Sequence, residues 1–292
     1  MKHHSTACNP APHTIVLRRR SSRRLAVIGA ALFAVLVPLA VDSIPSGATT
    51  GVPQVATSAF PSGIVSAREP SGKAPPGATA LPGYRLTYHQ DFTAGTLPPE
   101  WGRFNGVAGG NPGSMFLPNH VLVGGGMARI VTYRDPANNG GWASGGMCLC
   151  THPTRYGAYF VRSRVTGPGG NVSELLWPVA PVWPPEVDFN EMGRPTDSTS
   201  WTVHYGHGHT FEQRRHNFDM TRWHTWGVIW TPRLLTFTID GKAWGMLSTF
   251  SRIPHQAMTL DIQSETWCPG TEACPAQPSA LQVDWVTQYV RG

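Results

Sequence analysis

The sequence predicts an all-β domain built as a sandwich of two antiparallel sheets. Glycine (32 residues) and proline (27 residues) are abundant and only 14% of the residues are charged, a composition typical of turn-rich β domains. Short runs that alternate apolar and polar residues are separated by glycine-rich breaks. No long amphipathic helix pattern lies between these runs.

The first 43 residues have the pattern of an export signal. Five arginines between Arg18 and Arg24 precede an apolar stretch from Leu25 to Val41, and small residues follow it. Residues 1–43 are therefore predicted to be a signal peptide, which implies a secreted or cell-envelope protein. An uncleaved signal anchor that tethers the protein to a membrane is the alternative, because the apolar stretch is near the lower limit for spanning a bilayer.

Residues 44–82 are rich in Pro, Ser, Gly, Ala and Thr and show no periodicity, so we expect a disordered linker. Residues 83–292 then form the folded domain, with order beginning near Tyr84. The net charge of +6 comes mostly from the leader, and the rest of the chain is close to neutral. This charge gives no indication of nucleic-acid binding and suits an uncharged substrate. We expect the domain to be a monomer.

Within the domain, alternation and β-branched or aromatic residues mark the strands. Strands are predicted at 84–88, 120–123, 127–133, 159–165, 202–206, 223–230, 234–239, 242–247, 259–264 and 281–290. Asp240-Gly241 between two of these runs is a strong hairpin signal.

Four cysteines follow the leader, and an even number in an exported protein predicts disulfides. We expect a bond between Cys268 and Cys274, which would close a short Pro-Gly loop. Cys148 and Cys150 are two residues apart on a predicted strand, where alternate Cβ atoms lie too far apart for a mutual bridge. Pairing between the two clusters stays open, and a zinc site is the alternative.

The stretch from Trp183 to Gly193 concentrates three carboxylates. On a strand, Glu186 and Asp188 share a face, whereas Glu191 would point the other way unless a β-bulge at Phe189-Asn190 turns it back. Two neighbouring carboxyl groups are what glycoside hydrolysis needs, one as nucleophile and one as proton donor. Repulsion among three acids should raise at least one pKa. A metal site and a solvated surface are the alternatives.

Other polar and aromatic residues are candidates for the same surface. His204 shares a strand face with Thr202 and is predicted to point into the cleft. Trp142, Trp183 and Trp267 lie beside turn-rich stretches, where their rings suit the apolar faces of sugars. Packing in the core is the alternative for each tryptophan.

These segments resemble glycoside hydrolase family 16, the laminarinase and lichenase group. The family signature, Glu-hydrophobic-Asp-hydrophobic-x-Glu, stands at residues 186–191 in its bulged form. Residues 223–232, 239–242 and 283–286 also match in type and spacing, so the resemblance runs from about Tyr84 to Val290. It implies a concanavalin-like β-jelly-roll with a concave substrate groove.

The resemblance also implies roles. Glu186 would be the nucleophile, Glu191 the acid/base and Asp188 the residue that orients and tunes Glu186. His204 and either Trp177 or Trp183 would lie near the bound sugar.

The implied activity is that of a retaining endo-β-glucanase acting on β-1,3 or mixed β-1,3/1,4 links. It requires no cofactor, although Asp284 could hold a structural calcium ion. A non-catalytic carbohydrate-binding module and a transglycosylase of envelope polysaccharides are the alternatives. The chain departs from the family pattern in the Trp-Pro-Pro before Glu186 and in the acidic stretch 260–265, which leaves the substrate open.

Overall fold

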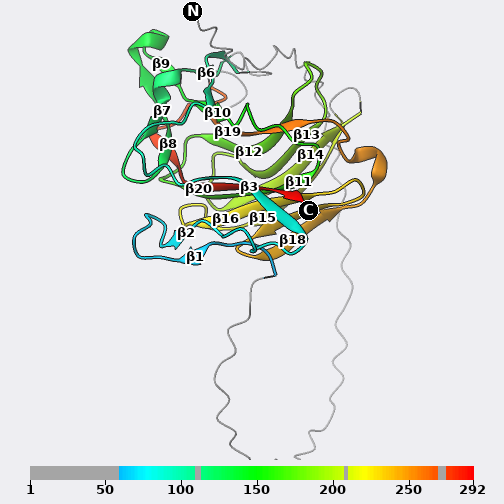
Figure 1. Cartoon of the computed structure of the whole chain (residues 1–292). Coiled ribbons are helices and arrows are strands. Elements are labelled where there is room, and N and C mark those ends of the chain that lie inside the picture. The colour runs from blue at the N-terminus through cyan, green and yellow to red at the C-terminus, as the bar shows by residue number, and fades with distance from the viewer. Residues whose placement is uncertain (1–58, 109–112, 207–209, 269–273) are drawn as a thin grey trace, which may run out of the picture. The chain divides into compact units, whose positions relative to one another are not determined.

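The structure is a computed structural model that describes residues 59–108, 113–206, 210–268 and 274–292. In these residues the chain forms two stacked layers of antiparallel strands (Figure 1), which confirms the predicted all-β sandwich. Helix is limited there to three 3-10 turns, η1 (Pro118–His120), η2 (Pro136–Asn138) and η3 (Phe250–Arg252). No helix in the described ranges is long and apolar enough to cross a membrane. The predicted leader lies outside these ranges.

One layer is a seven-stranded sheet in the part of the chain that the structure describes. Its strands, in spatial order, are β15 (Thr210–Asn217), β14 (Ser198–Tyr205), β13 (Glu186–Met192), β12 (Asn171–Pro178), β19 (Met258–Glu265), β10 (Gly146–Cys148) and β4 (Gly102–Arg103). The acidic stretch therefore occupies β13, an inner strand.

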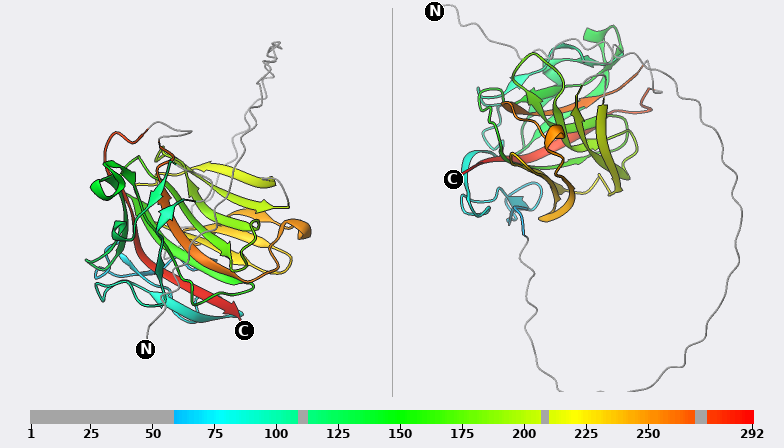
Figure 2. Two further views of the ribbon diagram at one scale, coloured as in Figure 1. Left: turned by 90° about the horizontal axis from the view of Figure 1, so that it is seen from above. Right: turned by 90° about the vertical axis from the view of Figure 1, so that its right-hand side faces the viewer.

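The second layer is a nine-stranded sheet among the described residues. Its main path is β18 (Lys242–Leu247), β17 (Leu235–Ile239), β16 (His224–Trp230), β11 (Gly157–Val165), β20 (Ser279–Arg291), β8 (Ala128–Asp135) and β7 (Val121–Val123), with β3 (Tyr84–Gln90) paired to β20 and β9 (Gly141–Ala143) to β8. Two small sheets pair β1 (Ile64–Val65) with β2 (Lys73–Ala74), and β5 (Gly106–Val107) with β6 (Met115–Phe116). The views in Figure 2 show that the long strands of both layers are curved and twisted.

The hydrophobic core lies between the two layers. Val187 and Phe189 of β13 are buried in the same cluster as Trp226 and Trp230 of β16. Trp201 of β14 stacks on Phe237 of β17, with ring centroids 4.7 Å apart. The alternation of β13 therefore buries its apolar side chains and leaves a polar face outside. We call the side of the seven-stranded sheet that points away from the core the outer face.

Residues 59–82, which the sequence predicts to be part of a disordered linker, instead pack on the second sheet, below β20 in Figure 1. We call them the N-terminal strap. Phe60 and Leu81 join a cluster with Trp285 and Tyr289. The Trp285 Nε1–H donates to the Lys73 carbonyl at 2.8 Å, and the Tyr289 hydroxyl donates to the Gly77 carbonyl at 3.0 Å. Because these bonds use strap backbone carbonyls, the strap needs no alternating pattern of its own.

Two cysteine pairs lie at disulfide distance in the described ranges. The predicted pair Cys268–Cys274 is one, with a Cα–Cα distance of 4.9 Å. The other is Cys148–Cys150 at 5.1 Å, so the prediction that these two are too far apart was wrong. β10 ends at Cys148, and Cys150 lies in the following turn, where the alternation of a strand no longer applies.

The sequence did not predict β15, whose residues alternate poorly and are mostly exposed. It is an edge strand bearing Glu212, Arg214 and Arg215, and charged side chains are a common protection of sheet edges. The hairpin predicted at Asp240-Gly241 is confirmed between β17 and β18, with positive φ at both residues.

Candidate active site

The predicted bulge is present in β13 and determines which side chains reach the outer face. Against β14, Asp188 pairs with Thr202 and Glu191 with Ser200, so β13 contains one extra residue between these pairs. Phe189 and Asn190 are both buried. Glu186, Asp188 and Glu191 therefore share the outer face, which is the arrangement that the bulged signature predicts.

Glu186 lies among Trp183, Asp188 and His204. The Trp183 Nε1–H donates to Glu186 Oε2 at 2.6 Å, and the Trp183 and His204 rings are 5.4 Å apart. His204 Nε2 is 3.8 Å from Asp188 Oδ2. One ligand-type atom from each of Glu186, Asp188 and His204 lies within 4.8 Å of the others. His204 therefore lies beside two of the acids, and its predicted role near a bound sugar stays a prediction.

Glu191 is held by side chains of the next two strands. Its Oε2 accepts hydrogen bonds from the Thr202 hydroxyl and, at 3.0 Å, from the Gln213 amide. Gln213 also donates to the Thr202 hydroxyl at 2.9 Å. The sequence did not identify Gln213, because β15 lacks the alternation that would have placed it on a strand face.

Glu186 and Asp188 differ from ordinary exposed carboxyl groups in their pKa values. Burial raises the pKa of Glu186 to about 7; the Trp183 hydrogen bond opposes this shift, and the negative charge of Glu191 adds a smaller increase. Burial and the charges of Glu186 and Glu191 raise the pKa of Asp188 well above its usual value. The hydrogen bond between them raises the pKa of Asp188 and lowers that of Glu186. The carboxyl groups of Asp188 and Glu186 are therefore neighbours, and burial opposes the ionisation of both.

A fourth buried acid, Asp261 of β19, belongs to the same surface. It is opposite Leu175, which is in turn opposite Asp188. It accepts from the Thr259 hydroxyl at 3.1 Å, and burial and the charge of Glu186 raise its pKa well above the usual range. The only sequence signal for it was the unusually acidic stretch 260–265.

The predicted tryptophans separate into two groups. Trp177 is half-buried and follows the Leu176–Val187 pair, so it lies with Trp183 at the Glu186 end of the outer face. Trp267 is half-buried and follows β19, whose last residues pair with the start of β12, so it lies at the Glu191 end. Each can offer part of its ring to a ligand.

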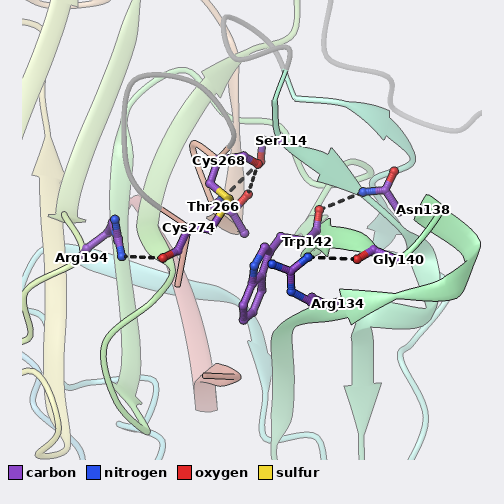
Figure 3. Close-up of a disulfide and its surroundings, with 9 residues drawn as sticks. All are labelled: Ser114, Arg134, Asn138, Gly140, Trp142, Arg194, Thr266, Cys268 and Cys274. Carbon is purple, nitrogen blue, oxygen red and sulfur yellow. Dashed lines mark hydrogen bonds between the residues drawn. A yellow bond between two sulfur atoms is a disulfide. The ribbon is translucent and has the colours of Figure 1, made fainter. Parts of the chain in front are cut away.

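Trp142 is less accessible than predicted. Its side chain is only 5% exposed, and the Arg134 guanidinium lies over its ring at 5.5 Å. Figure 3 shows Trp142 and Arg134 on one side of the Cys268–Cys274 disulfide and Arg194 on the other. The Arg194 guanidinium donates to the Cys274 carbonyl at 3.3 Å. Trp142 therefore packs within the domain near this disulfide.

A pocket of about 300 Å³ adjoins the Glu186 end of the outer face. Its lining includes Pro184 and Pro185, which directly precede Glu186, and Tyr205, which follows His204. Arg252 and His255 line the other side. The two prolines of the Trp-Pro-Pro sequence, which departs from the family pattern, therefore line a pocket beside the acids.

Two places could hold a metal ion. Glu186, Asp188 and His204 are close enough to share one, but the hydrogen bond between the two acids already joins their carboxyl groups. The second place is the one that the family resemblance implies, around Asp284, although no three ligand atoms gather there among the described residues. Asp284 is fully buried in β20 and accepts from the Ser71 N–H of the strap at 3.1 Å. The Asp284 Oδ1 atom has no hydrogen-bond partner among the described residues. The Glu69 and Asp91 carboxylates are near enough to interact electrostatically with Asp284 and with each other. These oxygen donors fit a hard cation such as calcium.

Comparisons with known proteins agree with this arrangement. The sequence matches the model of Glycosyl hydrolases family 16 over residues 119–287, more than half of the chain. A search of curated proteins found no match. Three solved structures are similar: the laminarinase from Rhodothermus marinus (20% identity, TM-score 0.63, covering 70% of this chain and 97% of that chain), the catalytic domain of an endo-1,3-beta-glucanase (laminarinase) from Thermotoga petrophila RKU-1 (17%, 0.61, 71% and 98%), and a non-specific endo-beta-1,3(4)-glucanase from family GH16 (21%, 0.63, 80% and 97%).

At these identities the structural likeness supports the β-jelly-roll fold, and the family match covers the acidic strand and both sheets. The region that matches includes β13, where the bulge brings three acids to one face. The chain therefore belongs to glycosyl hydrolases family 16 and is a glycoside hydrolase.

Proposed function

We propose that the protein is a retaining endo-β-glucanase that hydrolyses β-1,3 or mixed β-1,3/1,4 links. The observation that carries this proposal is the bulge in β13, which brings Glu186, Asp188 and Glu191 to one face. Two carboxyl groups on one face provide a nucleophile and an acid/base for double displacement. The preference for β-glucan is supported by the similar structures, which are described as laminarinases and endo-β-1,3(4)-glucanases.

In the proposed first step, a Glu186 carboxylate oxygen attacks the anomeric carbon, and Glu191 gives its proton to the departing glycosidic oxygen. In the second step, Glu191 takes a proton from water, the water oxygen bonds to the anomeric carbon, and the Glu186 ester bond breaks. The two inversions retain the configuration. Asp188 acts as the protonated neighbour that donates to Glu186 and keeps its reactive oxygen oriented.

Aromatic residues on the same face support a polysaccharide substrate. Trp183 both contacts Glu186 and borders the pocket residues Pro184 and Pro185. Trp177 lies beside it on β12, and flat rings such as these pack on the apolar faces of sugars. We further propose that the protein is exported by its leader and acts as a monomer without a catalytic cofactor.

We also propose that Asp284 helps to hold a structural calcium ion, on the other sheet from the acids. The unpartnered Oδ1 and the neighbouring carboxylates of Glu69 and Asp91 support this site. Such an ion would join the strap and β3 to β20 and would supply no chemistry to the reaction.

The experiment is to incubate the domain with laminarin, lichenan, agarose and chitin and to measure new reducing ends. Hydrolysis of the β-glucans with retention, observed as the β-anomer first by ¹H NMR, is the expected result. In the Glu186→Gln variant, kcat should fall by about 10⁴-fold or more, because the nucleophile is removed, while glucan binding remains. Cleavage of none of the glucans would contradict the proposal, and longer products would indicate a transglycosylase.

A further inference from the structure

The bulge in β13 requires two successive residues, Phe189 and Asn190, to point into the domain. Phe189 is apolar and joins the core. Asn190 is polar and only 1% exposed, so its amide needs partners inside the sandwich. In a regular strand Asn190 would be on the outer face and Glu191 would be in the core. The residues that receive the Asn190 side chain therefore help to decide where Glu191 points.

One of these partners is Thr199 of β14. Its hydroxyl donates to Asn190 Oδ1 at 2.7 Å. The other neighbour is Glu174 of β12, which is directly opposite Asn190 in the register, at the step where the bulge shifts the β12–β13 pairing. Asn190 is thus enclosed by a polar side chain from each flanking strand.

Glu174 is unusual because it is a fully buried acid that the proposed reaction does not use. Its polar neighbours are the Asn190 amide and the hydroxyl of Ser163 from β11 in the facing sheet, and its register partner on β19 is the apolar Ile262. Among the described residues, no charged group contributes to its pKa, which burial raises to about 8. Glu174 is therefore uncharged at neutral pH and can donate as well as accept.

Several polar atoms of Glu174, Asn190 and Ser163 form no direct hydrogen bond. Both Glu174 carboxyl oxygens, Asn190 Nδ2 and Ser163 Oγ are buried without a hydrogen-bond partner in the described structure. Neighbouring buried polar groups with no other partner either form hydrogen bonds with one another or lower the stability of the folded protein. An apolar residue at position 174 would avoid this cost, so a specific role is indicated.

We propose that Glu174 and Asn190, with Thr199, form an internal polar cluster that holds the bulge of β13 and so positions Glu191 on the outer face. Glu174 and Asn190 are positioning residues, because they act on the substrate only through Glu191. This inference rests on the proposed function, since it assigns Glu191 the acid/base role. It adds that a buried polar residue opposite the bulge is needed for the acid/base to point toward the substrate.

The test compares Glu174→Gln, Glu174→Leu and Thr199→Val in the full chain, assayed on laminarin. Glu174→Leu and Thr199→Val should lower kcat by about 10-fold and change KM less than twofold, because the acid/base is misaligned while the sugar-binding surface remains. Glu174→Gln keeps the shape and the donor, so kcat at pH 7 should stay within about twofold. The kcat of Glu174→Gln relative to the wild type should rise above pH 8, where Glu174 of the wild type becomes charged. This relative rise is a shift of the alkaline limb, because deprotonation of the acid/base Glu191 lowers the activity of both proteins alike.

Thr238→Val is the matched control. Thr238 of β17 is also fully buried with an unpartnered hydroxyl, but it lies in the other sheet. It should leave kcat and the pH profile unchanged at a comparable melting temperature. If Glu174→Leu does not fold, Thr199→Val and the alkaline limb of Glu174→Gln decide.

Unchanged kcat in Thr199→Val together with an unshifted alkaline limb in Glu174→Gln would overturn the positioning role. A kcat loss in Thr238→Val as large as in Thr199→Val would overturn it as well. A wild-type protein that cleaves none of the glucans would instead contradict the proposed function, so the two failures are distinguishable.

Discussion

The acids of the outer face and the acids of the second sheet have opposite surroundings. Asp135, at the end of β8, accepts hydrogen bonds from the Ala137 N–H at 2.7 Å and from His120 at 3.0 Å, and these bonds lower its pKa to about 2. On the outer face, burial raises the pKa values of Glu186, Asp188 and Asp261. The two groups differ in the hydrogen-bond donors and cationic side chains that surround their carboxyl groups.

Asp240 in the β17–β18 hairpin follows the pattern of Asp135. Burial alone would raise its pKa, but hydrogen bonds from His224 at 2.7 Å and the Thr225 N–H at 2.9 Å lower it. The hydrogen bonds to the structural acids therefore outweigh the effect of burial on their pKa values, whereas burial prevails for Glu186 and Asp188 of β13. Acids kept in this unfavourable state are typical of active sites.

The largest expected effect is a loss of kcat when an acid of the outer face, rather than an acid of the second sheet, is replaced. Asp188→Ala should lower kcat by about 10²-fold, because Glu186 loses the donor that orients it. Asp188→Asn retains an N–H donor and should lose less. Neither change should lower the melting temperature much, since the cost of burying the Asp188 carboxyl beside two other acids offsets the hydrogen bond that is lost. Steady-state kinetics and thermal melts on the same samples measure both, and a stable, fully active Asp188→Ala would remove the distinction between the groups.

The reciprocal change should affect stability alone. His120 is fully buried, and its two ring nitrogens contact Asp135 and the Val131 carbonyl. His120→Leu removes one of the donors to Asp135 and should lower the melting temperature by about 5 °C or more, because a buried hydrogen bond to a carboxylate and the stacking of the His120 ring on Tyr133 are lost. The kcat measured well below the melting temperature should not change. Lost activity in a folded His120→Leu protein would contradict this assignment.

The pH dependence should distinguish the groups next. The Asp135 pKa is lowered, so its contribution to stability is present above about pH 4 and is lost as the pH falls toward 2. The Glu186 pKa is raised from 4.5 to about 7, so the folded state binds the extra proton and stability declines as the pH rises between these values. Activity should rise over the same interval, because the nucleophile must be ionised.

Thermal melts from pH 2 to 8 test these windows. The melting temperature of Glu186→Gln relative to the wild type should increase between pH 5 and 8, and that of His120→Leu should recover relative to the wild type near pH 2. A wild-type activity profile with its acid limb near pH 4.5 would contradict the raised pKa of Glu186.

The sequence was sufficient for features that depend on local pattern. The alternation of Val187 and Phe189, interrupted by one residue before Glu191, predicted both the buried side of β13 and its bulge. Asp240-Gly241 predicted its hairpin for a similarly local reason, since two positive φ values favour these residue types. His204 followed from the parity of the neighbouring strand.

Features that depend on tertiary partners were not predictable in this way. The N-terminal strap is held by side chains of β20 more than 200 residues away, which donate to its backbone carbonyls. Gln213 reaches Glu191 from a strand with no alternating pattern. Glu174 resembles any polar strand residue until the β12–β13 register places it opposite Asn190. The sequence was therefore sufficient to locate the acids, whereas the residues that hold them in position became visible only in the structure.

The smallest expected effect concerns Asp284, which shares one property with each of the two groups of acids. Like the outer-face acids, Asp284 has a raised pKa through burial, yet like Asp135 it accepts a backbone N–H, from Ser71. A bound calcium ion would add the missing cation, so EDTA should lower the melting temperature by about 2–4 °C, and added calcium should restore it. In Asp284→Asn this difference should vanish while kcat stays the same, because the site is on the other sheet from Glu186. A wild-type melting temperature that is insensitive to EDTA would place Asp284 among the acids that the Ser71 N–H and the nearby Arg162 are sufficient to hold.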